Sequence, residues 1–251
     1  MKKHFLVVMM MVFALCANAK SIELPKQGFG VQIGWAQTVA RLNSPNTKLP
    51  KDSLANTIHL HGFKVGMVYD ASYIAGFGST IGLNYTFGTS STKWAKQNTG
   101  VMFSNYSERY KYLYNEVELF VDWQYKFEIA KETYLLLYTG PTIQCGITYT
   151  TRQDLRDDVT DEVKTTTVNS YTSHENYESN VDLNRLNVTW GVGAGFQYQR
   201  YFLRGGYDFG LLNPYKNKQF VNSAGETYDR NTRGRIDQWN IRLGIYLWYG
   251  K

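Results

Sequence analysis

The chain has 251 residues, with 27 lysines and arginines against 21 acidic residues and an aromatic content of 16%. A formal net charge of +6 spread along the chain is too small and too dispersed for a nucleic-acid-binding protein. With 20 tyrosines and 22 glycines the composition is typical of a β protein, and the length fits one large domain or two small ones.

The first residues have the pattern of a secretory signal peptide. Lys2 and Lys3 precede an apolar run, residues 5–15, that is too short to cross a bilayer as a helix. The sequence Ala17-Asn18-Ala19 then provides small residues for cleavage. We expect cleavage after Ala19, which leaves residues 20–251 as one exported domain with a net charge of about +4, because two of the 27 basic residues are removed.

The two cysteines do not predict a disulfide. Cys16 leaves with the signal peptide, so Cys145 remains alone and no internal disulfide is expected. A lipid anchor on Cys16 is the alternative, but the bulky Leu15 stands where a lipoprotein signal needs a small residue.

Eight segments of the exported domain alternate bulky apolar residues with small or polar ones, which is the period of a β-strand. In chain order they are residues 29–38, 61–69, 77–87, 110–127, 133–149, 187–198, 201–211 and 237–249. The last segment is the clearest. Its apolar face is formed by Trp239, Ile241, Leu243, Ile245, Leu247 and Tyr249, and its other face by Gln238, Asn240, Arg242, Gly244, Tyr246 and Trp248.

The connections between these segments alternate in length. The long ones are residues 43–57, 88–105, 150–185 and 213–235, and the short ones are residues 70–72, 128–132 and 199–200. An even number of strands with long connections at one end and short turns at the other is typical of outer-membrane barrels. A soluble sandwich has no reason to sort its loops in this way.

The small face of the strands decides which side points inward. The lumen of eight strands is narrow and must be packed by side chains, so a face rich in Gly, Thr and Asn fits it and a face of bulky aromatics does not. We therefore predict an all-β, eight-stranded antiparallel up-and-down transmembrane β-barrel with its apolar face in lipid. Long outer loops, short periplasmic turns and two periplasmic termini would place it in the outer membrane of a gram-negative cell.

The run of residues 112–147, YLYNEVELFVDWQYKFEIAKETYLLLYTGPTIQCGI, resembles the central passage of the PorT-like outer membrane β-barrel family. The matching positions are Tyr112, Glu116, Leu119, Tyr125, Phe127, Tyr134, Gly140 and Pro141. Residues 207–213 are similar to the family's exit from its seventh strand, whereas Phe120 stands where the family usually has proline. The resemblance implies an eight-stranded outer-membrane barrel but no single function, since some members serve a secretion apparatus.

The last strand also resembles the signal that the barrel-assembly machinery reads during insertion. Arg242, Gly244, Leu247 and Tyr249 fit its spacing, although Gly250 and Lys251 follow where a terminal aromatic is usual.

Charged residues on the small face are candidates for a network inside the lumen: Glu116, Glu118, Asp122, Arg204, Asp208 and Arg242. Buried charges must be paired and hydrogen-bonded, so we expect ion pairs that fill the barrel, with Arg242 opposite Glu116 or Glu118. A gated or selective pore is the alternative, for which eight strands leave little room.

Aromatic residues near strand ends or on outer faces predict a girdle at the membrane interfaces: Trp35, Trp123, Trp190, Tyr198, Trp239 and Tyr249.

Residues that could carry other chemistry lack partners in the sequence pattern. His59 and His61 share a strand face, but two imidazoles are too few for a metal site. Ser173-His174, or Asp52-Ser53 with His59, fall in loops without a strand to hold a catalytic arrangement. The acidic run of Asp154, Asp157, Asp158, Asp161 and Glu162 has no glycine-containing cation loop. We expect no catalytic residues, metal or cofactor.

The sequence therefore predicts a non-enzymatic barrel that acts as a structural or interaction protein, through anchoring, adhesion or membership of a secretion apparatus. Its expected partners are outer-membrane lipid, the barrel-assembly machinery and an envelope or secretion protein. A channel for small solutes or hydrophobic ligands, and a hydrolase acting on lipid or peptide at the outer rim, remain open as alternatives.

Overall fold

The computed structural model of the chain describes residues 27–42, 57–74, 76–96, 106–169, 183–214, 219–221, 227–229 and 234–250. The predicted signal peptide, Asp52-Ser53 and Ser173-His174 lie outside these residues.

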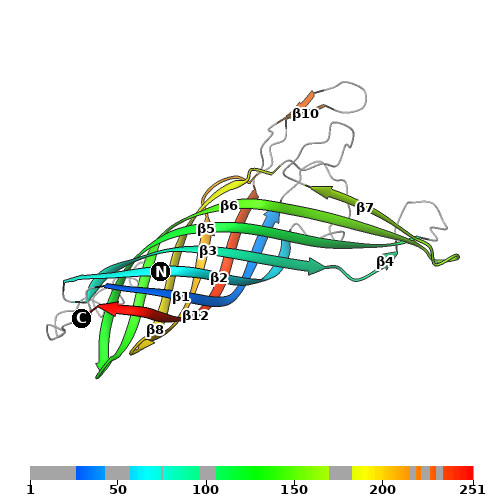
Figure 1. The fold of residues 1–251 in the computed structure, drawn as a ribbon. Coiled ribbons are helices and arrows are strands. Elements are labelled where there is room, and N and C mark those ends of the chain that lie inside the picture. The colour runs from blue at the N-terminus through cyan, green and yellow to red at the C-terminus, as the bar shows by residue number, and fades with distance from the viewer. Residues whose placement is uncertain are drawn as a thin grey trace, which may run out of the picture.

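Eight strands form one closed ring in which each strand pairs antiparallel with its neighbours in the chain (Figure 1). They are β1 (Gln27–Leu42), β2 (Thr57–Ile74), β3 (Phe77–Ser91), β5 (Tyr106–Ala130), β6 (Thr133–Asp157), β8 (Leu186–Tyr198), β9 (Tyr201–Gly210) and β12 (Gly234–Gly250). Pairing of β1 with β12, from Gln27 opposite Gly250 to Leu42 opposite Gly234, closes the ring. The predicted up-and-down barrel of eight strands is confirmed.

The faces of the barrel are inverted relative to a soluble protein. On β3 the large apolar residues Ile81, Leu83, Tyr85 and Phe87 are each between 41 and 44% exposed on the outside. The polar residues between them, Thr80, Asn84 and Thr86, are buried in the lumen. A continuous apolar outer surface is stable in lipid rather than in water, and the closed ring leaves no unpaired strand edge within it. The chain is thus a transmembrane β-barrel.

Within the described segments, no helix is long and apolar enough to cross a membrane.

The short turns gather at one end of the barrel. Gln27 pairs with both Gly250 and Ala71, so the ends of the barrel sequence lie at this same rim. The expected turn at residues 70–72 is wrong, because β2 continues to Ile74, which pairs with Phe77 at the start of β3. The turn expected at residues 128–132 tightens to Lys131 and Glu132, where Glu132 has a φ of 57°.

A bulge alters the end of the last strand. Phe29 pairs with Trp248 but Gly30 pairs with Tyr246, so Leu247 is an extra residue on β12. Leu247 and Trp248 are therefore both outside, at 57 and 52% exposure, and Tyr249 turns toward the lumen. The alternation expected to hold through Tyr249 is wrong for the last two residues.

The longest expected loop is partly a sheet. Residues 150–157 continue β6, and β7 (Val163–Asn169) pairs back against them from Thr150 opposite Asn169 to Arg156 opposite Val163. Both faces of this hairpin are polar, so an alternation of apolar with polar residues could not reveal it. On the other side, β4 (Ala95–Lys96) pairs with β5 at Glu108 and Ser107.

We call residues 106–115, residues 148–157, β4 and β7 together the extended sheet. Figure 1 shows it running on beyond the barrel, at the end with the long connections. A separate small hairpin, β10 (Gln219–Val221) with β11 (Thr227–Asp229), also belongs to this end.

Lumen glycines make room for aromatic rings. Phe202 and Tyr246 have ring centroids 4.8 Å apart and form a buried apolar cluster with Val68 and Phe120. The Phe202 ring covers Gly244, and a Cβ added to this glycine would lie 2.1 Å from the ring. The glycine is therefore a packing requirement of the narrow lumen.

Replacement of this glycine tests the packing. We expect Gly244→Ala to destabilise the barrel by about 1–3 kcal/mol, the usual cost of overpacking a core. Gly205→Ala is the matched control, because the Cβ it adds has its nearest neighbour at 3.8 Å. Urea unfolding in detergent micelles measures both variants, and equal stability of the two would contradict this account.

Candidate functional site: the filled lumen and its rim

Two groups of buried charges fill the lumen. In the first, Lys64 Nζ lies 2.6 Å from the Glu118 carboxylate and also donates to Gln238. Glu118 accepts further hydrogen bonds from Thr86 and Asn84, at 3.1 and 3.2 Å. Because Lys64 and Glu118 are each only 1–2% exposed, the pair replaces the water that both ions have lost.

The second group is centred on Asp70, nearer the end with the short turns. Lys126 Nζ lies 2.8 Å from its carboxylate, and Gln124 and the Tyr246 hydroxyl donate to it at 2.8 and 2.6 Å. Lys126 in turn donates to Gln197, which donates to the Tyr249 hydroxyl at 2.6 Å. Tyr249 thus closes the lumen at this end, and its expected place in the outer girdle is wrong.

The six charged residues predicted for the lumen all lie on strand faces that point inward, but their partners differ. Glu116 accepts hydrogen bonds from Tyr114 and Gln238, both at 2.8 Å. Asp208 accepts one from Asn240 at 2.8 Å. These two carboxylates are therefore held by neutral donors rather than by a direct cation.

Two arginines form the layer between the groups. Arg204 lies 3.6 Å from Asp122 and donates to Gln124 at 2.8 Å. Arg242 stacks over Phe120 at 4.9 Å and approaches the Tyr138 hydroxyl at 3.5 Å. The expected pairing of Arg242 with Glu116 or Glu118 is wrong, because Lys64 occupies that place.

Sequence reasoning missed Lys64, Lys126 and Asp70. Lys64 and Lys126 stand at inward positions of predicted strands, so the alternation itself carried the signal. Asp70 was hidden by its assignment to a turn. With them, the described lumen holds five carboxylates against four basic side chains: Asp70, Glu116, Glu118, Asp122 and Asp208 against Lys64, Lys126, Arg204 and Arg242.

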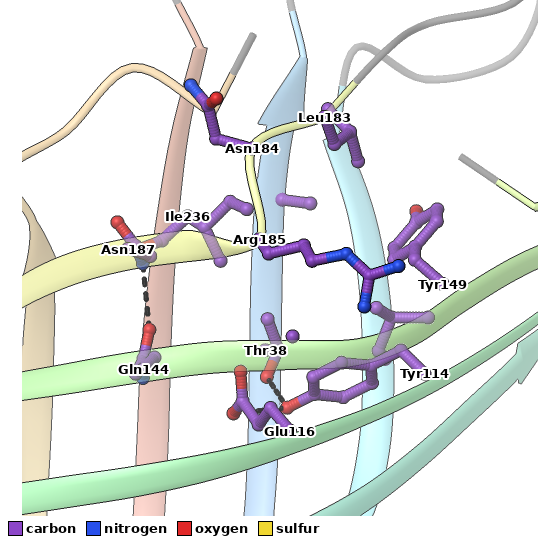
Figure 2. A pocket seen from close by; sticks show the side chains of 13 residues that line it. Thr38, Tyr114, Glu116, Gln144, Tyr149, Leu183, Asn184, Arg185, Asn187 and Ile236 are labelled. Carbon is purple, nitrogen blue, oxygen red and sulfur yellow. Dashed lines mark hydrogen bonds between the residues drawn. The ribbon is translucent and has the colours of Figure 1, made fainter. Parts of the chain in front are cut away.

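An apolar cap closes the lumen at the other end. Leu60, Tyr114, Tyr149 and Leu183 form a buried cluster, and the segment 183–185 crosses above it (Figure 2). This segment is attached to β6 by a hydrogen bond of 2.7 Å from the Gly146 amide to the Arg185 carbonyl. Below it lies a cavity of about 30 Å³, where Figure 2 shows Glu116 and Thr38 beside Tyr114, and Asn187 bonded to Gln144. Such a volume holds roughly two water molecules.

A larger pocket lies at the rim, where two strands part. The pairing of β2 with β3 ends at His61 opposite Thr89. Beyond this point β2 stays with β1 as far as Thr57, while β3 stays with β5. The fork between them holds a pocket of about 360 Å³ lined by Thr57, Ile58, His59, Ser90, Thr92, Lys93, Ala95, Glu108, Tyr110 and Tyr112.

The Tyr110 side chain is held by two hydrogen bonds in this fork pocket. Its hydroxyl donates to Glu108 at 3.2 Å and accepts from Gln153 at 3.0 Å. Burial and the neighbouring Glu108 charge raise the pKa of Tyr110 to about 12, so the phenol stays protonated.

The acidic run is dispersed over the end of β6 and the turn that leads to β7. Asp154 is bonded to Arg109, Arg152 and Lys111 at 2.9, 2.8 and 3.1 Å. The Arg109 hydrogen bond, with those of the other two cations, holds the pKa of Asp154 well below its usual range. Asp157 instead caps the hairpin turn by accepting the Val159 amide at 2.8 Å. Across the described segments, no three His, Cys, Asp or Glu side chains are grouped to hold a metal ion.

The remaining aromatic residues predicted for the girdle point outward. Trp123 and Trp190 have ring centroids 5.9 Å apart on the outer surface, and Trp35 stacks on His61 at 5.8 Å. Trp239 and Tyr198 are also exposed on this surface. His61 is thus an outward stacking partner, while His59 lines the fork pocket.

Comparison with known proteins finds no matching family model and no matching curated sequence. The PorT-like resemblance therefore stays a prediction. Among solved structures, the chain is similar to Ail, the attachment invasion locus protein of Yersinia pestis, with 10% identity and a TM-score of 0.36 over 88% of this chain and 98% of that one. It is also similar to neisserial surface protein A, with 11% identity and a TM-score of 0.34 over 88% and 97% of the two chains. A third similar structure is the N-terminal barrel domain of Pseudomonas aeruginosa OprF, with 9% identity and a TM-score of 0.26 over 86% of this chain and 97% of that one.

The buried Lys64–Glu118 pair allows a test of the filled lumen. We expect Lys64→Met to destabilise the barrel by about 3–5 kcal/mol, because it leaves the Glu118 charge buried without its cation. The double variant Lys64→Met with Glu118→Leu should recover most of this loss. Denaturant unfolding of the wild type, both single variants and the double variant gives the coupling energy. A double variant no more stable than Lys64→Met would show that the pair is not the dominant interaction.

Proposed function

We propose that this protein is a non-enzymatic outer-membrane barrel that acts through its surfaces and its rim rather than by passing solutes through its lumen. The single observation that carries the proposal is the filling of the lumen: charged networks, a layer of aromatic rings and an apolar cap occupy it along its length. Inside the described barrel, the cavity under the cap has a volume of only about 30 Å³.

The proposed location follows from the architecture. Closed barrels are the β-structures that satisfy every backbone group in lipid, and those of the outer membrane carry short turns on the periplasmic side. We therefore assign the short turns and both ends of the barrel to the periplasm, and the extended sheet to the outer side. The signal-peptide pattern of residues 1–19 and the assembly-signal pattern of Arg242, Gly244, Leu247 and Tyr249 support export followed by insertion.

The expected role is structural or interaction-based, with an envelope or secretion protein as partner. The extended sheet supports this role because it carries strands well beyond the barrel, and β7 is the outermost of the described strands on its side, where an added strand would pair.

Planar-bilayer recording tests the proposal. The purified barrel, shown to be folded by its heat-dependent gel mobility, should insert without steady single-channel currents, because buried side chains pack the described lumen. Large, steady currents from the wild-type protein would contradict the proposal.

The fork pocket favours a second candidate function, the binding of a small hydrophobic ligand at the rim. A volume of about 360 Å³ lies within the range of small-molecule sites, and Ile58, Tyr110 and Tyr112 provide apolar and aromatic walls. The apolar cap lies between this pocket and the lumen, so the site would hold a ligand rather than conduct it.

Phenol is a suitable probe, since it combines a ring with one hydroxyl. We expect Ser90→Trp, which fills the fork pocket, to abolish phenol binding in calorimetric titration of the barrel. Thr89→Trp, one residue away and exposed on the outer face, should leave binding unchanged. Equal binding by both variants, or none by the wild type, would rule out this second function.

A further inference from the structure

The outward face of the extended sheet continues the lipid-facing surface of the barrel. On β5 the outward residues include Leu119, Val117, the polar Asn115 and then Leu113, followed by Lys111 and Arg109. The register shift between β5 and β6 at Asn115 and Glu116 brings Arg152, Asp154 and Arg156 onto the same face. The same surface thus changes from apolar to basic as it leaves the membrane.

Five basic side chains gather on this outward face against two acidic ones. The basic residues are Lys96, Arg109, Lys111, Arg152 and Arg156, and the acidic residues are Asp154 and Asp158. We call this group the basic face. It keeps an excess of three positive charges, and the side chains of Lys111 and Arg152 remain 38 and 49% exposed.

The basic face is held in a fixed arrangement. Asp154 binds three of its cations, with distances of 2.8–3.1 Å, and is itself almost completely covered. Trp94 lies under two guanidinium groups, with Arg109 at 4.5 Å and Arg156 at 5.0 Å from its ring. The positive charges are therefore positioned before any ligand arrives, which lowers the entropic cost of binding.

The position of the basic face relative to the membrane surface decides which anion it contacts. Lys111 follows Leu113, an exposed apolar residue of the same strand face, at a distance of two residues, or roughly 7 Å along the strand. Lysine and arginine side chains just beyond an apolar membrane surface reach the level of the lipid headgroups. Their charge is complementary to the phosphate of an anionic lipid, and the guanidinium group of Arg152 suits phosphate oxygens.

We propose that the basic face binds the phosphate groups of anionic lipids in the adjoining leaflet, with Lys111 and Arg152 as the main contacts. This binding fixes the depth of the barrel and anchors the extended sheet to the membrane surface. The inference goes beyond the proposed function and holds for either orientation of the barrel, since both leaflets of a membrane can present such lipids.

Native mass spectrometry of the full-length barrel, released from micelles that contain phosphatidylglycerol or phosphatidylcholine, tests the inference. We expect selective retention of phosphatidylglycerol by the wild type. The double variant Lys111→Gln with Arg152→Gln should lose roughly tenfold or more of this affinity, because each basic residue near an anionic surface contributes about fivefold. Asp154 keeps its contact with Arg109 in this variant, so the sheet should remain folded.

The matched control removes two charges at the opposite rim. Lys131 and Arg200 are exposed in the short turns, and Lys131→Gln with Arg200→Gln changes the net charge by the same amount. This control should keep wild-type retention of phosphatidylglycerol. An equal loss in both double variants, or no loss in either, would overturn the proposal.

A parallel titration with a sulfated oligosaccharide separates lipid from a soluble polyanion. Loss of oligosaccharide binding in the Lys111/Arg152 variant, with lipid retention unchanged, would also overturn the proposal and assign the basic face to a soluble ligand. Lipid retention that falls in this variant while oligosaccharide binding does not would support it.

Discussion

A ring of eight strands leaves a lumen that only side chains can fill, and in lipid none of the strands can be left with an open edge. This pair of constraints explains most of what the chain contains. The apolar residues must lie outside, and the inward residues must be small, or large and matched to a glycine opposite, as Phe202 is to Gly244. Charges that enter the lumen must bring their partners with them, since the packed interior leaves room for very little water.

The lumen charges depend on one another across the ring. Lys64 comes from β2 and Glu118 from β5, with β3 between them, so the ion pair spans the interior instead of following one strand pairing. The ion pair of Asp70 with Lys126 also joins β2 to β5, nearer the end with the short turns. Arg204 and Arg242, around Tyr138, separate the two groups with guanidinium and aromatic planes. A path through the barrel would require several of these buried pairs to break together.

Sequence reasoning succeeded where the environment of a residue follows from the alternation of inward and outward side chains along a strand. All eight strands and the inward position of the six lumen charges could be predicted from a period of two. It failed where a bulge shifts the alternation by one residue, as the extra residue Leu247 does for Tyr249. It also failed where both faces of the sheet are polar, as along β7. The partner of Arg242 was out of reach for a different reason. The alternation predicts that a side chain points into the lumen. Which residue it meets across the lumen depends on how far each strand of the ring is shifted relative to the next.

The same alternation of side chains gives the extended sheet two different surfaces, one facing the fork pocket and one forming the basic face. Tyr110 and Tyr112 point to the inner side and line the fork pocket, while Arg109 and Lys111, one residue away from each, belong to the basic face. Holding the outer surface against a charged membrane would therefore also hold the wall of the pocket. Asp154 lies at the centre of the basic face, and its neighbour in sequence, Gln153, donates to Tyr110 on the pocket side. A single stretch of β6 thus supports both surfaces, since Asp154 orders the basic face and Gln153 orders the aromatic wall.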